Sequence, residues 1–351
     1  NILDFEKDYK DAKVFKLEQN YRSTKVILNA ANSVISNNES RKDKKLWTEN
    51  NEGEPITVFT ATTEQEEAYY VAHTIGEDLT ARGSYAFNDC AVLYRTHAQS
   101  RALEEAFIRM SIPYRIIGGR RFYDRKEVKD LLAYLQLIVN PAEDLSFKRV
   151  VNVPRRGIGE ASIQKLEQFA SERNISLLEA AKEAGSCPGL RITAVRDLNA
   201  FAEMIQNSAR QAEFIELHEL VEQILSTSGI LADLQKERSI ESQTRVENVM
   251  EVVSVARDFV EKNMDNSLSD FLGSVALVTQ GDDYEQIDDR FVSLMSLHSA
   301  KGLEFPVVFL AGMEEGVFPH MRALYEPTEL EEERRLCYVG ITRADRKSTR
   351  L

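Results

Sequence analysis

The stretch VSLMSLHSAKGLEFPVVFLAGM, residues 292–313, predicts the fold of the chain more directly than any other. Its two apolar runs, VSLMSL and PVVFLAGM, lack the polar alternation of a half-exposed strand and are typical of buried strands in a parallel sheet. Between the runs lie His298, Lys301 and Glu304. Ligands of open α/β sheets bind at the carboxyl ends of strands, so these side chains are candidates for a ligand site. A charged, solvated loop is the alternative, and this segment alone does not decide between the two.

The composition indicates a globular protein of about two domains. The 351 residues are 43% hydrophobic and 29% charged, which is enough apolar material for a sizeable core. No apolar run reaches the ~18 residues of a membrane span, and the polar start NILDFEKDYKDAK does not resemble a signal peptide. We therefore expect a cytoplasmic protein without a membrane partner. The three cysteines are far apart, without a CxxC pair or a histidine cluster, so we predict reduced core thiols and no metal site.

The net charge of -13 argues against a protein that coats nucleic acid with its whole surface. Two basic stretches in the middle of the chain still allow a local contact with nucleic acid. They are LSFKRVVNVPRRG, residues 145–157, and residues 113–131.

The predicted secondary structure differs between two parts of the chain. Up to about residue 117, helical and strand patterns alternate, and they cover residues 23–35, 56–61, 64–79, 90–95 and 98–110. A capping box from Thr63 to Glu66 is predicted to open the helix over 64–79. Long helical patterns follow up to about residue 282, and the first of them comes after a predicted capping box from Asp124 to Glu127.

Strand patterns appear again after the polar stretch QGDDYEQIDD, residues 280–289. The predicted fold is therefore α/β, with a parallel-sheet domain interrupted by a mostly α-helical inserted domain. We expect the sheet domain over residues 19–120 and 283–351, and the inserted domain over 121–282.

Two further stretches carry candidate functional residues. QNYRS, residues 19–23, precedes a helix whose expected cap is Ser23 or Thr24. Free N–H groups at a helix start and the guanidinium of Arg22 both favour an anion. A core tyrosine beside a surface ion pair is the alternative. ERRLCYVGITRA, residues 333–344, predicts an amphipathic helix with Arg343 at its end.

Together and in this order, QNYRS, VSLMSLHSAKGLEFPVVFLAGMEEGVFP and EERRLCYVGITRA resemble the fourth, fifth and sixth motifs of UvrD/PcrA/Rep-type superfamily-one DNA helicases. The likeness is closest to the PcrA-like enzymes of Gram-positive bacteria. It extends through LYRTHAQSR, GGRRFYDRKEVKD and PRRGIG and thus covers nearly the whole chain. The resemblance implies a second RecA-like motor domain that carries a helical insertion.

The resemblance also implies roles at an ATP site between two RecA-like domains. Tyr21 would stack on the adenine, and Glu304 would contact the ribose. Arg22 and Arg343 would be catalytic arginine fingers at the γ-phosphate, where positive charge is worth roughly 10³ to 10⁵ in rate. His298 and Lys301 would couple the ATP site to DNA.

The chain lacks a GxxxxGK[ST] phosphate loop and a strand that ends in paired acids. The resemblance places these parts, including the Mg²⁺ ligands, in a first RecA-like domain before Asn1, of which residues 1–18 would be the tail. We therefore expect a fragment that does not hydrolyse ATP alone. At the other end, the polar DRKSTRL after Ala344 departs from the apolar strand of the family and leaves the last strand of the sheet open.

For DNA, LYRTHAQS resembles the segment that lines the single-strand channel, so Arg95, Thr96 and His97 are candidate contacts. The family commonly has asparagine at the position of His97. A histidine can stack on a base or donate to a phosphate, and a loop histidine without a role is the alternative.

PRRGIG, residues 154–159, has the form of a glycine hairpin that leads into a helix from about Glu160. Backbone N–H groups of Gly157 and Gly159, with Arg155 and Arg156, could hold a duplex phosphate. A simple turn between two helices is the alternative.

We thus expect the carboxyl-terminal part of an ATP-dependent 3'–5' DNA helicase or translocase, which uses ATP with Mg²⁺. Its partners would be single-stranded DNA, a duplex junction and the first RecA-like domain. Two alternatives remain open: a non-catalytic regulatory module that binds DNA or a protein, and part of an AddA-like helicase–nuclease subunit.

Overall fold

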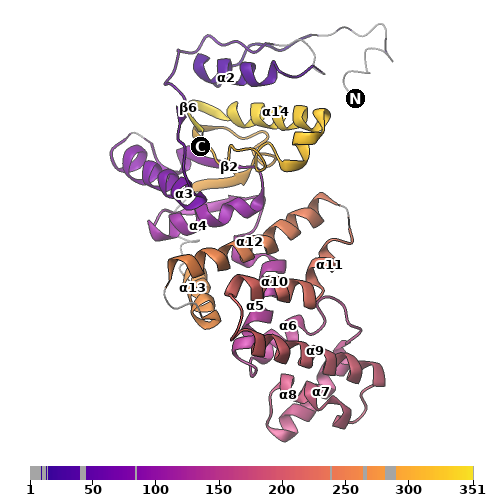
Figure 1. The fold of residues 1–351 in the computed structure, drawn as a ribbon. Helices are drawn as coiled ribbons and strands as arrows, with labels where there is room; N and C mark the ends of the chain where they lie inside the picture. Colours follow the sequence, from indigo (N-terminus) through magenta and orange to yellow (C-terminus); the bar gives the residue numbers. More distant parts are fainter. Residues whose placement is uncertain are drawn as a thin grey trace. The chain divides into compact units, whose positions relative to one another are not determined.

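The computed structural model describes residues 9, 13, 15–39, 45–83, 85–237, 239–263, 267–280 and 290–350. The chain divides into two compact units (Figure 1). One unit, the sheet unit, takes the described residues up to Arg121 and those from Arg290 onward. The other, the helical unit, takes the described residues from Phe122 to Gln280.

The sheet unit is built on a six-stranded sheet in the order β1-β6-β5-β2-β4-β3. Every neighbouring pair of strands is parallel. The strands are β1 (Thr57–Val58), β2 (Cys90–Tyr94), β3 (Tyr114–Ile117), β4 (Val292–Ser296), β5 (Phe305–Leu310) and β6 (Ala344–Arg350). All residues of β2 and β4 are buried, as continuous apolar runs predict for central parallel strands. The predicted α/β fold class with a RecA-like parallel sheet is confirmed.

Helices cover both faces of this sheet (Figure 1). On one face, α2 (Lys25–Ile35) and α14 (Pro327–Ile341) pack over residues of β2 and β5 in one apolar cluster. On the other face, α3 (Glu64–His73), its π-helical continuation over Thr74–Ala81, and α4 (Ser100–Arg109) form a second cluster. The sheet is therefore buried on both sides.

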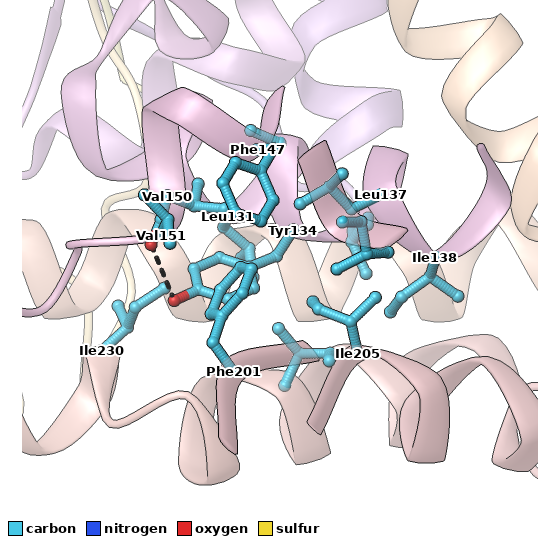
Figure 2. Close-up of a cluster of buried hydrophobic side chains, with 14 of the residues drawn as sticks. Leu131, Tyr134, Leu137, Ile138, Phe147, Val150, Val151, Phe201, Ile205 and Ile230 are labelled. Carbon is cyan, nitrogen blue, oxygen red and sulfur yellow. Dashed lines mark hydrogen bonds between the residues drawn. The ribbon is translucent and has the colours of Figure 1, made fainter. Parts of the chain in front are cut away.

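The described part of the helical unit contains α5 (Lys126–Val139), α6 (Asp144–Val150), α7 (Glu160–Arg173), α8 (Leu177–Lys182), α9 (Ile192–Gln211), α10 (Leu217–Thr227), α11 (Ile230–Leu234), α12 (Ile240–Lys262) and α13 (Leu268–Gln280). Its core is aromatic at the centre (Figure 2). The Phe201 ring lies 6.0 Å from the Tyr134 ring and 5.5 Å from the Phe147 ring between centroids. The buried Tyr134 hydroxyl has two carbonyl acceptors, Val153 at 2.5 Å and Val150 at 3.3 Å, so its polar atom is satisfied.

The two predicted capping boxes have different outcomes. Thr63 is the N-cap of α3, and its hydroxyl accepts from the Glu66 N–H at 3.2 Å, which is one half of the predicted box. The Glu66 carboxylate accepts from the Thr62 N–H at 2.7 Å instead of completing the box at Thr63. The box from Asp124 to Glu127 is wrong, because Arg125 is the N-cap of α5 and makes no side-chain cap. The Glu127 carboxylate instead accepts from Asn248 Nδ2 at 2.6 Å, so a tertiary contact replaces the local one.

Strands β3 and β6 differ from expectation. β3 was not predicted from the sequence, and its residues are only half-buried or exposed. The segment after Arg343 does form a strand, β6, despite its polar sequence. Backbone pairing with β5 on one side and β1 on the other supplies its hydrogen bonds, and these do not depend on apolar side chains.

Candidate functional site

The segment between β4 and β5 runs from the carboxyl ends of the parallel strands back to their amino ends. We call these two sides of the sheet the carboxyl edge and the amino edge. Ser293 of β4 and Val308 of β5 both pair with Ala91, so the two strands are level. β4 therefore ends at the carboxyl edge, and β5 begins at the amino edge. Residues 297–304, the crossing segment, must span β5, which is ~17 Å long, and eight residues reach at most about 26 Å.

This crossing corrects one expectation. The charges after β4 were expected together at the carboxyl ends of the strands. Only His298 directly follows the end of β4, whereas Glu304 immediately precedes β5 at the amino edge. The reason is topological, because β4 and β5 run in the same direction on either side of β2, so the chain must return to the amino ends of the strands before β5 begins.

At the amino edge, Arg22, Glu304 and Arg343 come together. Arg22 Nε donates to Glu304 Oε2 at 2.5 Å, and Arg22 Nη1 donates to the Thr342 carbonyl at 3.2 Å. Arg343 Nη1 donates to the carbonyl of Leu303, the residue before Glu304, at 3.1 Å. We call Tyr21, Arg22, Glu304 and Arg343 together the amino-edge cluster.

Two guanidinium groups and one carboxylate give the amino-edge cluster a net charge of +1. Burial lowers the pKa of Arg343, the positive charge of Arg22 lowers it further, and Glu304 opposes both effects. Arginine nevertheless keeps its charge in proteins. Tyr21 is 79% exposed, so the core tyrosine of the alternative is wrong, whereas its ion pair is present between Arg22 and Glu304 at 2.5 Å. The cluster offers an exposed ring, an acceptor and two cations, which suit an anionic nucleotide.

Asparagine side chains fix the backbone of QNYRS. Asn50 Nδ2 donates to the carbonyls of Tyr21, Arg22 and Ser23 at 3.3, 3.1 and 3.2 Å. Asn20 Oδ1 accepts from the N–H groups of Arg22 and Ser23 at 2.9 and 2.8 Å. Neither role was predicted from the sequence. Asn20 lies inside the motif and could have been found, whereas no local pattern connects Asn50 to it.

The start of α2 does not offer the free N–H groups that the sequence predicted. Its N-cap is Thr24, as expected, but the side chain makes no capping bond. The N–H groups of Lys25 and Val26 donate to the carbonyls of Asn51 and Glu52 at 3.2 and 3.0 Å. A neighbouring segment therefore occupies these donors, and an anion at the amino-edge cluster would depend on the arginines instead.

At the carboxyl edge, Arg95 follows β2 and binds Glu333 of α14. Arg95 Nε lies 3.0 and 3.1 Å from the two Glu333 oxygens, and Nη2 lies 2.9 Å from Oε1. Gln99 Oε1 accepts from the backbone N–H groups of Arg95 and Thr96, both at 2.9 Å. His97 is half-buried, and its ring lies 6.1 Å from the Tyr94 ring between centroids.

His298 and Lys301 lie on the crossing segment and are exposed. Partial desolvation lowers the pKa of His298, and the nearby charge of Arg95 lowers it further, against Glu333 and Glu332. His298 is thus within electrostatic reach of the carboxyl-edge residues. The neutral ring, which can both donate and accept, is favoured near neutral pH.

In the helical unit, the residues of PRRGIG divide into an exposed group and the half-buried Arg156. Arg155, Gly157 and Gly159 are exposed, and Gly159 is the N-cap of α7. Arg156 is half-buried, and its guanidinium faces inward. Arg156 Nη1 donates to four carbonyls between residues 150 and 154 at 3.0 to 3.3 Å, and Nη2 donates to Tyr134 Oη and Ser228 O at 2.7 and 2.9 Å. This geometry favours a structural role for Arg156.

The described residues contain no group of three or more His, Cys, Asp or Glu side chains that could hold a metal ion. Among the same residues, no helix combines the length and apolar content needed to cross a membrane.

Comparison with known proteins identifies the family. The UvrD-like helicase C-terminal domain matches residues 15–348. The chain is 47% identical to "ATP-dependent DNA helicase PcrA" of Staphylococcus aureus over 349 residues, which is 98% of this chain and 47% of that protein. The Bacillus subtilis protein of the same name is 47% identical over 352 residues, 99% of this chain and 47% of the relative. The chain thus spans about half the length of the curated relatives it matches, and it belongs to the family of UvrD-like helicase C-terminal domains.

Proposed function

We propose that the chain is the second motor domain, with its helical insertion, of an ATP-dependent DNA helicase. It would work with a first RecA-like domain that supplies the phosphate loop and the Mg²⁺ ligands. The translocation on single-stranded DNA would run 3' to 5', as in the family that the motifs resemble. The observation that carries the proposal is the convergence of Arg22 and Arg343 on Glu304 at one edge of the sheet.

The amino-edge cluster has the groups that phosphoryl transfer needs from a second domain. The described contacts use Nε and one Nη1 hydrogen of Arg22, so further guanidinium hydrogens can meet phosphate oxygens. Arg22 and Arg343 would stabilise charge on the γ-phosphoryl group in the transition state. Glu304 could accept from a ribose hydroxyl, and the exposed Tyr21 ring could stack on adenine.

At the carboxyl edge, Arg95, Thr96 and His97 would contact single-stranded DNA. A guanidinium can hold a phosphate, and a histidine ring can stack on a base. His298 and Lys301 would relate the two sites, because the crossing segment connects the two edges within eight residues.

In the insertion, Arg155 with the Gly157 and Gly159 N–H groups would hold a duplex phosphate at the start of α7. Neither glycine has an atom within 4 Å of the position that a Cβ would take, so this surface is open. We leave Arg156 out of the proposed contact, because its donors already have internal acceptors.

The test is the steady-state ATPase rate of the full-length protein at saturating single-stranded DNA. Arg22→Ala and Arg343→Ala should each lower the maximal rate by roughly 10³, while the affinity for single-stranded DNA stays within a few fold. Lysine at either position should rescue poorly, since an ammonium lacks the planar fork of a guanidinium. Because both groups would address one phosphoryl group, the double variant should show a coupling energy of about 0.5 to 3 kcal/mol.

Arg346→Ala is the matched control, because Arg346 lies three residues further along, is exposed, and pairs only with Asp345 at 3.6 Å among its described ion-pair contacts. Its rate should equal that of the wild type. A folded Arg343→Ala protein with a normal rate would remove the arginine-finger assignment. Strictly additive losses would place the two arginines at separate sites.

A further inference from the structure

We infer that Glu333 is a positioning residue that sets the geometry of the Arg95 contact with a nucleic-acid phosphate and relays occupancy of that contact along α14. The inference rests on the proposed function, and it assigns a role to a residue that the motif comparison did not single out. Glu333 and Arg95 are 238 residues apart in sequence and meet through the fold alone.

Glu333 is the meeting point of three hydrogen-bond donors. Its carboxylate accepts from Arg95 Nε and Nη2, and Oε2 also accepts from the backbone N–H of His320 at 3.0 Å. The Glu333 side chain is only 9% exposed, and that of Arg95 is 23% exposed. A buried carboxylate whose two oxygens both accept hydrogen bonds has little freedom to rotate, so it also fixes the Arg95 guanidinium that is bonded to it.

The pairing with Glu333 leaves one nitrogen of the Arg95 guanidinium for a ligand. The described hydrogen bonds of the Arg95 side chain use Nε and Nη2, so Nη1 is the nitrogen that remains for a phosphate oxygen. A bidentate ion pair fixes the plane of the guanidinium as well as its distance. Glu333 therefore determines the direction in which Arg95 presents Nη1.

Helix α14 connects this pair to the amino edge. From Glu333 to Ile341 the helix rises about 12 Å, and Arg343 follows two residues later. Near that end, Gly340 packs so closely that a Cβ would lie 2.4 Å from Leu297 Cδ2 and 3.2 Å from Leu310 Cδ2. The helix is thus held against the crossing segment and β5, and a displacement at Glu333 is passed on to Arg343 rather than absorbed by loose packing.

The experiment measures ATPase activity of the full-length protein with and without oligo(dT). Glu333→Gln keeps the shape of the side chain but removes the charge that orients Arg95. The basal rate without DNA should change less than the DNA-stimulated rate. The oligo(dT) concentration for half-maximal stimulation should rise about tenfold, as expected for loss of an oriented phosphate contact. Arg95→Lys should give the same shift.

Glu332→Gln is the matched control on the same helix. Glu332 pairs with Arg335 at 2.9 Å, and its side chain is 72% exposed. Its variant should respond to oligo(dT) like the wild type. If Glu333→Gln does not fold by circular dichroism, Glu333→Asp, which keeps the charge at a shorter reach, should give a shift in the same direction and of smaller size.

A double variant separates positioning from general stability. In the Arg95→Ala background, Glu333→Gln should cause no further change in half-maximal oligo(dT), since there is no guanidinium left to orient. A wild-type DNA response of Glu333→Gln, additive effects with Arg95→Ala, or equal losses of basal and stimulated rates would each overturn the inference. Absence of DNA-stimulated ATPase in the wild-type full-length protein would instead overturn the proposed function itself.

Discussion

Replacing Arg156 tests whether PRRGIG is a DNA contact, a structural turn, or both. In Arg156→Ala, four carbonyls between residues 150 and 154, the Ser228 carbonyl and the Tyr134 hydroxyl lose a donor. The guanidinium also leaves its position 5.3 Å from the centre of the Phe201 ring. The two Nη groups have four hydrogens, so about four hydrogen bonds are lost.

The expected cost follows from these bonds. At about 1 kcal/mol net for each bond, with part of the loss recovered because water reaches a half-buried site, the helical unit should lose about 3 kcal/mol of unfolding free energy. For a unit of this size, 1 kcal/mol changes the melting temperature by about 2 to 4 °C, so the shift should be roughly 6 to 12 °C. Arg155→Ala, one residue away and exposed, should stay within about 0.5 kcal/mol.

Two spectroscopic signals distinguish the two units in the 351-residue chain. Trp47 is the single tryptophan and lies in the sheet unit, so its fluorescence reports that unit. Circular dichroism at 222 nm is dominated by helices, most of which lie in the helical unit. The Arg156→Ala shift should appear in the dichroism and leave the tryptophan transition unchanged.

A lysine at position 156 adds a graded test. Its ammonium has three donors at a single point and cannot reach both sets of acceptors, so Arg156→Lys should recover only part of the lost stability. An Arg156→Ala protein that melts like the wild type would refute the structural role, because the internal hydrogen bonds would then contribute nothing measurable.

Three further predictions concern other parts of the chain. Arg155→Ala in the full-length protein should reduce the salt dependence of duplex binding by about one phosphate contact, and an unchanged slope would return Arg155 to a surface role. Burial and the charge of Asp89 raise the pKa of the Cys90 thiol to about 12, so iodoacetamide at pH 8 should modify Cys90 in urea but not in the native protein, and rapid native labelling would contradict this. The pKa of His298 is lowered in the folded state, so the unfolded chain binds more protons and stability falls as the pH drops below the usual value of about 6.5. His298→Gln should flatten that decline, measured as urea midpoints from pH 7 to 5, and an identical decline in the variant would contradict the shift.

Elements with a strong local pattern could be predicted from the sequence. The continuous apolar runs predicted β2, β4 and β5, and the Thr63 hydroxyl predicted the start of α3. β3 has only four residues, none fully buried, so its pattern was too weak. β6 is polar and depends on pairing with β5 and β1, which local periodicity does not report.

The candidate site divides in the same way. Motif resemblance selected Arg22, Glu304 and Arg343, and the structure brings these three together. Their catalytic roles stay predictions. The contacts that fix them come from remote residues, such as Asn50 beside QNYRS and Glu333 beside Arg95. Such contacts depend on the folded chain, and neither residue has a spacing or composition that would reveal its partner.

The parallel pairing of β3 with β4 has a consequence for protein engineering. Tyr114 pairs with Val292 and Ile117 with Met295, so the chain leaves β3 at the carboxyl edge of the sheet and enters β4 at the amino edge. Everything between these strands therefore serves as one crossover connection, a task that an ordinary α/β protein assigns to a single helix of a dozen or more residues. Splicing residue 117 directly to residue 292 would leave the strands unable to pair in parallel. A designed helix of the usual crossover length could replace the whole segment, which makes the helical unit an exchangeable module within an otherwise ordinary sheet.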